Sequence, residues 1–189
     1  MNWEAIVSSF TLVAASEMGD KTQLLAFTLA SRFRRPWTVM AGILVATLAN
    51  HALASSVGAW ISAHLQPRLL AAMLAVTFIG FGLWTLRPDA LDEDQRPARF
   101  GPFLTTAVLF FLAEMGDKTQ FATVALGAKF HSAAMVTVGT TLGMALSDGL
   151  AVFLGEKLAH RVQGRWLRVT AAVLFFGFGL VTAWAVIVG

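Results

Sequence analysis

EMGDKTQ at residues 17–23 occurs a second time, letter for letter, at residues 114–120. Each copy places two acids and one lysine inside a long run of apolar residues. Charged side chains that are removed from water are costly unless they are paired or bind an ion. A charged heptapeptide that recurs in such surroundings therefore indicates a functional site built from two related parts.

The sequence around the two motifs is that of a membrane protein. Of its 189 residues, 57% are hydrophobic and 13% are charged, whereas soluble domains carry about 25% charged residues. The apolar runs do not alternate with polar residues as barrel strands do, and a helix needs about 20 apolar residues to cross a bilayer. We therefore predict an all-α integral membrane protein with six transmembrane helices, at residues 4–30, 36–63, 69–87, 102–128, 133–158 and 166–188.

The composition also excludes several classes of function. The chain contains no cysteine, which excludes disulfides, thiolate metal sites and thiol catalysis. Its isoelectric point is near 10, but the basic residues lie at the ends of the apolar runs, so we expect no nucleic-acid partner. The first run carries Glu4 and lacks a basic leader, so we expect it to be retained and not cleaved as a signal peptide.

Basic residues are distributed unevenly among the breaks between the predicted helices. The breaks after the second and fourth helices contain only Arg68 and Lys129. The breaks after the first, third and fifth helices contain Arg32, Arg34, Arg35, Arg87, Arg96, Arg99, Lys157, Arg161, Arg165 and Arg168. Positive charge stays on the cytoplasmic side, so we expect a cell inner membrane protein with a cytoplasmic central loop and both termini in the periplasm.

The two motifs belong to a duplication that covers most of the chain. A shift of 97 residues, from 17 to 114, aligns the sequence with itself, and GFGL at 80–83 falls on GFGL at 177–180. We divide the chain into a first three-helix repeat at 1–87, a cytoplasmic linker at 88–100 and a second three-helix repeat at 101–189. Three is an odd number, so the second repeat must enter the membrane from the opposite side. This predicts two inverted repeats with an ion site near the bilayer midplane.

The acids of the two motifs are predicted to form one cation site. Residues three positions apart share a helix face, so each glutamate is expected to point the same way as its aspartate, and inversion would bring the two faces together. Four carboxylates at that depth require a cation, protons or basic partners to neutralise them. We therefore predict a metal site made of Glu17, Asp20, Glu114 and Asp117, with Gln23 and Gln120 as further oxygen ligands.

The basic and hydroxyl residues of the motifs fit more than one role. Lys21 and Lys118 can balance the acids through salt bridges, gate the site by filling it when the cation leaves, or extend toward the membrane interface. Thr22 and Thr119 either line the ion pathway or bond to their own backbone, as threonines in membrane helices often do. The sequence supports each of these roles.

The glycines of the motifs also leave two structures open. Gly19 and Gly116 each lie between the glutamate and the aspartate, and a glycine inside a helix costs about 1 kcal/mol relative to alanine. Such a glycine permits either close contact between helices or a helix break that frees backbone carbonyl groups for an ion.

A second group of polar residues lies deep in the predicted second and fifth helices. The shift by 97 residues places Asp148 on His51 and Ser147 on Asn50. A buried aspartate has no inexpensive structural role in lipid, and histidine titrates near physiological pH. We expect Asp148, His51 and Asn50 to line the proton or ion pathway, while His51 also fits a satisfied core histidine.

These motifs carry a resemblance to a known family. Two copies of E-M-G-D-K-T-Q in two three-helix repeats resemble the GDT1 family, also called UPF0016, whose hallmark is E-x-G-D-[KR]-[ST] once in each half. The resemblance covers nearly the whole chain, and the short form is similar to the bacterial manganese exporters of that family. It implies that the four motif acids bind the metal and that the cation is exchanged for protons.

We therefore predict a secondary transporter that exports Mn²⁺ from the cytoplasm, with no enzymatic activity and no cofactor. Oxygen ligands suit any hard divalent cation, so a Ca²⁺/H⁺ antiporter with the same site is the alternative, and only the resemblance favours manganese. An exporter of small organic cations would use aromatic walls, yet the chain has no tyrosine. The expected partners are membrane lipid, the divalent cation and protons, and the oligomeric state is left open.

Overall fold

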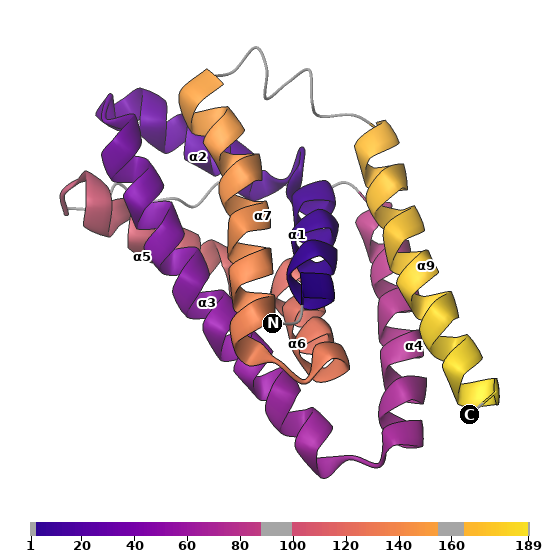
Figure 1. The fold of residues 1–189 in the computed structure, drawn as a ribbon. Coiled ribbons are helices and arrows are strands. Elements are labelled where there is room, and N and C mark those ends of the chain that lie inside the picture. The colour runs from indigo at the N-terminus through magenta and orange to yellow at the C-terminus, as the bar shows by residue number, and fades with distance from the viewer. Residues whose placement is uncertain (1–2, 88–99, 155–164, 189) are drawn as a thin grey trace.

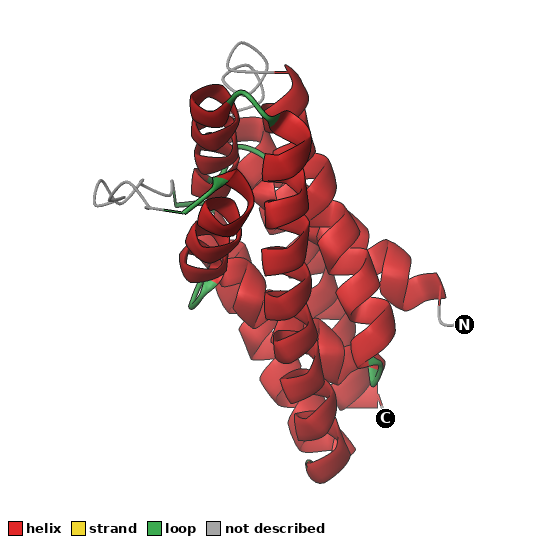
Figure 2. Ribbon diagram, turned by 90° about the vertical axis from the view of Figure 1, so that its left-hand side faces the viewer, coloured by secondary structure: helices red, strands yellow, loops and turns green. Residues whose placement is uncertain are grey.

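The computed structural model of the protein describes residues 3–87, 100–154 and 165–188. In these ranges every regular element is a helix (Figures 1 and 2). The first half contains α1 (Trp3–Glu17), α2 (Lys21–Phe33), α3 (Pro36–His64) and α4 (Pro67–Thr85). The second half contains α5 (Pro102–Glu114), α6 (Lys118–Phe130), α7 (Ala133–Leu154) and α9 (Arg165–Val188).

Three of the described helices are long and apolar enough to cross a membrane. They are α3 with 29 residues, α4 with 19 and α7 with 22. Proline occupies the first turn of both α3 and α4, where its missing N–H costs no helical hydrogen bond. An all-helical membrane protein, as predicted, fits these helices. Residues 88–99 of the predicted linker and 155–158 of the predicted fifth helix lie outside the described residues.

The predicted helices at 4–30 and 102–128 are each interrupted at the repeated motif, which corrects the expectation of one continuous helix. α1 ends at Glu17 and α2 begins at Lys21, and α5 and α6 are separated at the equivalent residues. The break occurs because Gly19 has φ +85° and Gly116 has φ +78°, in the left-handed region that glycine adopts without steric cost. In Figure 1, α2 leaves the end of α1 in a new direction. Glu17 and Asp20 therefore do not share a face of one helix.

The helices of each half pack mainly against helices of the other half. α1 of the first half packs against α7 of the second, and α5 of the second half packs against α3 of the first. Glycines at equivalent positions make both contacts close: a methyl group at Gly139 would collide with the carbonyl oxygen of Ile6, and one at Gly42 with that of Phe103. Each half therefore supplies the surface on which the broken helices of the other half rest.

The long helices at equivalent positions run in opposite directions. In Figure 1, α3 and α7 lie side by side and antiparallel, as do α4 and α9. Ring contacts define the order along α4 and α9, because Phe78 meets Phe178 while Phe81 meets Phe175. The numbers rise on one helix as they fall on the other, which is the relation expected of antiparallel neighbours.

The apolar core also joins the halves. Buried side chains form one cluster around Phe78, Leu126 and Phe175, and a second around Ile43 and Phe110. Each cluster contains residues from both halves of the chain, so neither half encloses a core of its own. Separation of the halves would expose both clusters.

A candidate cation site between the two halves

The breaks in the motif helices are supported by the glutamines of the motifs. The side-chain oxygen of Gln23 accepts from the backbone N–H of Gly19 at 3.0 Å, and that of Gln120 accepts from Gly116 at 2.8 Å. A break in an apolar surrounding leaves backbone groups without their helical partners, and these must be satisfied locally. In this conformation the oxygens that the sequence suggested as ligands bond to the backbone.

The other end of each glutamine binds the opposite half. Gln23 Nε2 donates to the carbonyl oxygen of Ser147 on α7 at 2.9 Å, and Gln120 Nε2 donates to Asn50 Oδ1 on α3 at 3.3 Å. Ser147 and Asn50 are equivalent positions of the repeat. Asn50 Nδ2 in turn donates to the carbonyl oxygen of Phe111 at 3.0 Å. The long helices therefore hold the breaks in place.

Three of the four motif acids gather into one cluster. Glu17, Asp20 and Asp117 each offer a carboxylate oxygen, and these oxygens lie within 4.8 Å of one another. Oxygen ligands bind Ca²⁺ at about 2.3–2.6 Å, so one ion between opposed oxygens would fit a spacing of this size. Asp20 is the N-cap residue of α2 and Asp117 that of α6, so both carboxylates lie at helix N-termini. The residues come from both halves, and all three are buried.

The lysines of the motifs neutralise the aspartates across the two halves. Lys21 Nζ lies 2.8 Å from Asp117 Oδ1, and Lys118 Nζ lies 2.8 Å from Asp20 Oδ1. Each ammonium therefore pairs with the acid of the other motif rather than with its own neighbour in sequence. Sequence reasoning anticipated charge balance but missed this exchange, because adjacency along the chain gives no information about pairing across a packed interface.

The two glutamates have different surroundings. Glu17 accepts a hydrogen bond from Thr22 Oγ1 at 3.1 Å and another from Thr119 Oγ1, so hydroxyls from both halves bind its carboxylate. Glu114 is equally buried, but neither of its oxygens has a hydrogen-bond partner among the described residues. Its charge is repelled by the other three motif acids and by Asp148.

Comparison with known proteins identifies the family. A family model described as "Divalent cation/proton antiporter GDT1" matches residues 5–93 and 102–188, and each matched segment contains one copy of the motif. The chain belongs to the GDT1 family. The family is described as one of divalent cation/proton antiporters, the class of transporter that the sequence predicted.

Relatives from several organisms align over most of the chain. A candidate manganese exporter of Vibrio cholerae is 45% identical over 93% of this chain and 88% of its own length. A GDT1-like protein of Synechocystis is 29% identical over 95% of this chain and 97% of its own length. A GDT1-like protein of Arabidopsis thaliana is 27% identical over 94% of this chain and 70% of its own length. No solved structure matches the chain.

Asp148 and His51 lie outside the cluster of motif acids. Both side chains are buried, and neither has a hydrogen-bond partner within the described ranges. Asp148 lies on α7 close enough to Glu17 for the two carboxylates to repel each other. His51 is the residue of α3 that the sequence repeat aligns with Asp148 of α7.

Proposed function

We propose that the protein exports Mn²⁺ from the cytoplasm in exchange for protons. The observation that carries the proposal is the buried cluster of Glu17, Asp20 and Asp117, whose oxygens converge from both halves. Buried acids are retained in membrane proteins mainly where they bind ions or protons. The family description supports a divalent cation and protons as substrates, and the name of the Vibrio cholerae relative supports manganese.

The proposed architecture is that of six spans in two inverted repeats. In it, α1 with α2 forms one interrupted span, and α5 with α6 forms its inverted counterpart. The opposite directions of α3 and α7, and of α4 and α9, support the inversion. Transporters with inverted repeats use interrupted helices to bind ions near the midplane, which suits the breaks at Gly19 and Gly116. We place both termini in the periplasm and the linker at 88–100 in the cytoplasm.

Binding of the cation requires the lysines to leave the aspartates. A divalent ion held by Glu17, Asp20, Glu114 and Asp117 would replace the two ammonium groups that lie 2.8 Å from the aspartates. The ion would also give Glu114 a partner, which none of the described residues provides in this conformation. Gln23 and Gln120 would add their oxygens only after releasing the glycine N–H groups. In this proposal the lysines act as internal cations that occupy the site between transport cycles.

Protons complete the proposed cycle by competing with the metal for the same carboxylates. Asp148 lies beside Glu17 and is buried without a hydrogen-bond partner in the described part of the chain, so it suits a proton pathway that ends at the cluster. His51 and Asn50 lie at the related positions of the other half, and the hydroxyls of Thr22 and Thr119 line the approach to Glu17. Rocking of one half against the other would then expose the site to each side in turn.

Transport by purified protein in vesicles tests the proposal. With Mn²⁺ on one side and a pH gradient across the membrane, wild type should move Mn²⁺ against protons, and Glu17→Gln should abolish both movements. Arg68→Gln is the control, because Arg68 is an exposed charged residue at the start of α4 and lies outside both motifs. Mn²⁺ movement by Glu17→Gln at the wild-type rate would overturn the cation site.

The same vesicles distinguish manganese from calcium. Oxygen donors alone accept either ion, so wild type should be given Mn²⁺ with increasing Ca²⁺, and then the reverse. Inhibition of Ca²⁺ transport by low Mn²⁺, without the converse, supports Mn²⁺ export. The opposite order of affinities would support a Ca²⁺/H⁺ antiporter that uses the same acids.

A further inference from the structure

Lys129 is a basic residue that the cation site does not use. It is the second-last residue of α6, and its ammonium donates to Thr182 Oγ1 on α9 at 3.0 Å. The ammonium also lies 5.1 Å from the ring centroid of Phe178, a distance at which the ring face attracts a cation. No carboxylate oxygen of the described residues lies within 4.0 Å of it. Its position is fixed, but its charge has no counter-ion in contact.

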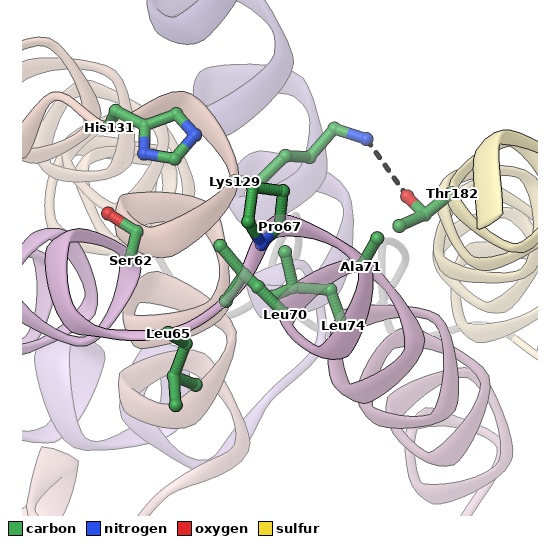
Figure 3. A pocket seen from close by; sticks show the side chains of 9 residues that line it. All are labelled: Ser62, Leu65, Pro67, Leu70, Ala71, Leu74, Lys129, His131 and Thr182. Carbon is green, nitrogen blue, oxygen red and sulfur yellow. Dashed lines mark hydrogen bonds between the residues drawn. The ribbon is translucent and has the colours of Figure 1, made fainter. Parts of the chain in front are cut away.

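Two cavities meet at this lysine. One has a volume of about 220 Å³ and lies beside Ser62 and His131, at the turn between α3 and α4 (Figure 3). The other has a volume of about 350 Å³ and includes Glu4 and residues of α9. Figure 3 shows the lysine side chain extending away from His131 and toward Thr182. Thr182 lines the first cavity and Phe178, whose ring lies under the ammonium, lines the second, so the ammonium lies between the two cavities.

The second cavity combines an apolar wall with two opposite charges. Val173, Gly177 and Val181 of α9 line it, and both valines are exposed. A methyl group at Gly177 would have no atom within 4 Å, so this wall is open. Glu4 lines the same cavity, and its charge acts favourably on Lys129. We call this cavity the α9 groove.

The α9 groove lies at one end of the membrane crossing. Lys129 comes just before the turn that joins α6 to α7, and Glu4 is in the first turn of α1. Phospholipid headgroups lie at this level, and basic pockets between helices bind their phosphates. An apolar wall that ends in one base and one acid matches a lipid whose headgroup carries both charges.

We propose that the α9 groove binds a zwitterionic phospholipid with a primary ammonium headgroup. Its phosphate lies on the Lys129 ammonium, its own ammonium donates to the Glu4 carboxylate, and an acyl chain lies along α9 over Gly177. An anionic headgroup would bring no positive charge to Glu4, and a choline headgroup has no N–H to donate. The related positions in the other half hold Arg32 and Gly101, so the acid–base pair is present once.

Competitive lipid binding tests this assignment independently of transport. Purified, delipidated protein is mixed with equal amounts of phosphatidylethanolamine, phosphatidylcholine and phosphatidylglycerol with identical chains, and bound lipid is counted by native mass spectrometry. Hydrogen bonds to charged groups are stronger than those between neutral groups, so wild type should prefer phosphatidylethanolamine by about tenfold or more. Lys129→Gln should lose this lipid, and Glu4→Gln should bind the ethanolamine and choline lipids equally.

Two further variants separate loss of the groove from loss of the fold. Gly177→Leu fills the groove at a position with open space, so it should fold and still lose the lipid. Arg68→Gln is the matched control, because Arg68 is exposed, follows the turn between α3 and α4, and lines neither cavity. Equal retention of phosphatidylethanolamine by wild type and Gly177→Leu overturns the proposal, as does a preference of wild type for phosphatidylglycerol.

Discussion

The two copies of EMGDKTQ have the same letters and different environments. Glu17 is bound by hydroxyls from both halves, whereas Glu114 has no hydrogen-bond partner among the described residues. The side chain of Lys118 is 5% exposed in its ion pair, whereas that of Lys21 is 27% exposed. Two identical motifs therefore supply the same chemical groups but do not give them the same hydrogen bonds or the same burial. A site shared by two halves can be symmetric in composition and asymmetric in any one conformation.

The largest difference in stability is expected between variants of the two motif lysines. Lys118→Met leaves the buried carboxylate of Asp20 without its 2.8 Å partner, and breaking a buried ion pair in this way costs about 3–5 kcal/mol. Lys21→Met removes a partly exposed partner of Asp117, so its cost should be clearly smaller. Thermal unfolding of the cation-free protein in detergent measures both.

A double variant sharpens this first comparison. Asp20→Asn with Lys118→Met removes both charges, and it should recover most of the stability that Lys118→Met loses. Asp117→Asn with Lys118→Met leaves the Asp20 carboxylate in place and should recover little. Equal recovery by the two aspartate variants would show that the pairing is not exchanged between the motifs. Equal losses for the two lysine variants would show that the two ion pairs do not differ in burial in solution.

The second-largest effect is expected from the two threonine hydroxyls, which bond to Glu17 and not to Glu114. Thr22 and Thr119 both donate to Glu17, and an unsatisfied buried polar group costs about 1–3 kcal/mol. Thr119→Val should therefore destabilise the cation-free protein by about 1–3 kcal/mol, because the buried carboxylate of Glu17 loses one of its two hydroxyl donors. Thermal unfolding of the purified protein without cation measures the change.

A double-mutant cycle assigns the threonine effect to one glutamate. Thr119→Val should lose most of its effect on the stability of the cation-free protein in a Glu17→Gln background, because the shared contact is already altered. In a Glu114→Gln background its effect should persist. Coupling of Thr119 to Glu114 instead of Glu17 would mean that the asymmetry of the two glutamates is not present in solution.

The smallest difference in stability is expected between variants of the two motif glutamines. Gln23→Leu and Gln120→Leu each remove the acceptor for a glycine N–H at the helix break, at a cost of about 1 kcal/mol for a typical hydrogen bond. Gln23 is fully buried and Gln120 is half-buried, so the loss should be greater for Gln23. Amide hydrogen exchange at Gly19 and Gly116 should accelerate only at the glycine whose partner was changed.

Much of the fold follows from the sequence because it depends on local pattern. The apolar runs and the 97-residue repeat predict a helical membrane protein with two related halves, and the described helices agree with the helical class. The breaks at Gly19 and Gly116 do not follow, because a glycine at about 1 kcal/mol is tolerated inside a helix and also permits a positive φ. The number of spans and their inversion stay a prediction.

The sequence predicts which residues gather at the candidate site, but it does not predict which of them bond to one another. Acids in an apolar run identify Glu17, Asp20 and Asp117 as residues that need partners, and the structure gathers them. Which ammonium reaches which carboxylate depends on the packing of the two halves, and no spacing within one motif contains that information. The motif also does not show that the hydroxyls of Thr22 and Thr119 both bond to Glu17 and not to Glu114.

Each half of the chain holds an aspartate whose ammonium belongs to the other half. A half expressed alone would therefore place its aspartate in an apolar surrounding without the ammonium that the other half supplies. Two halves expressed as separate chains in one cell should associate and rebuild both ion pairs, because each completes the charge balance of the other.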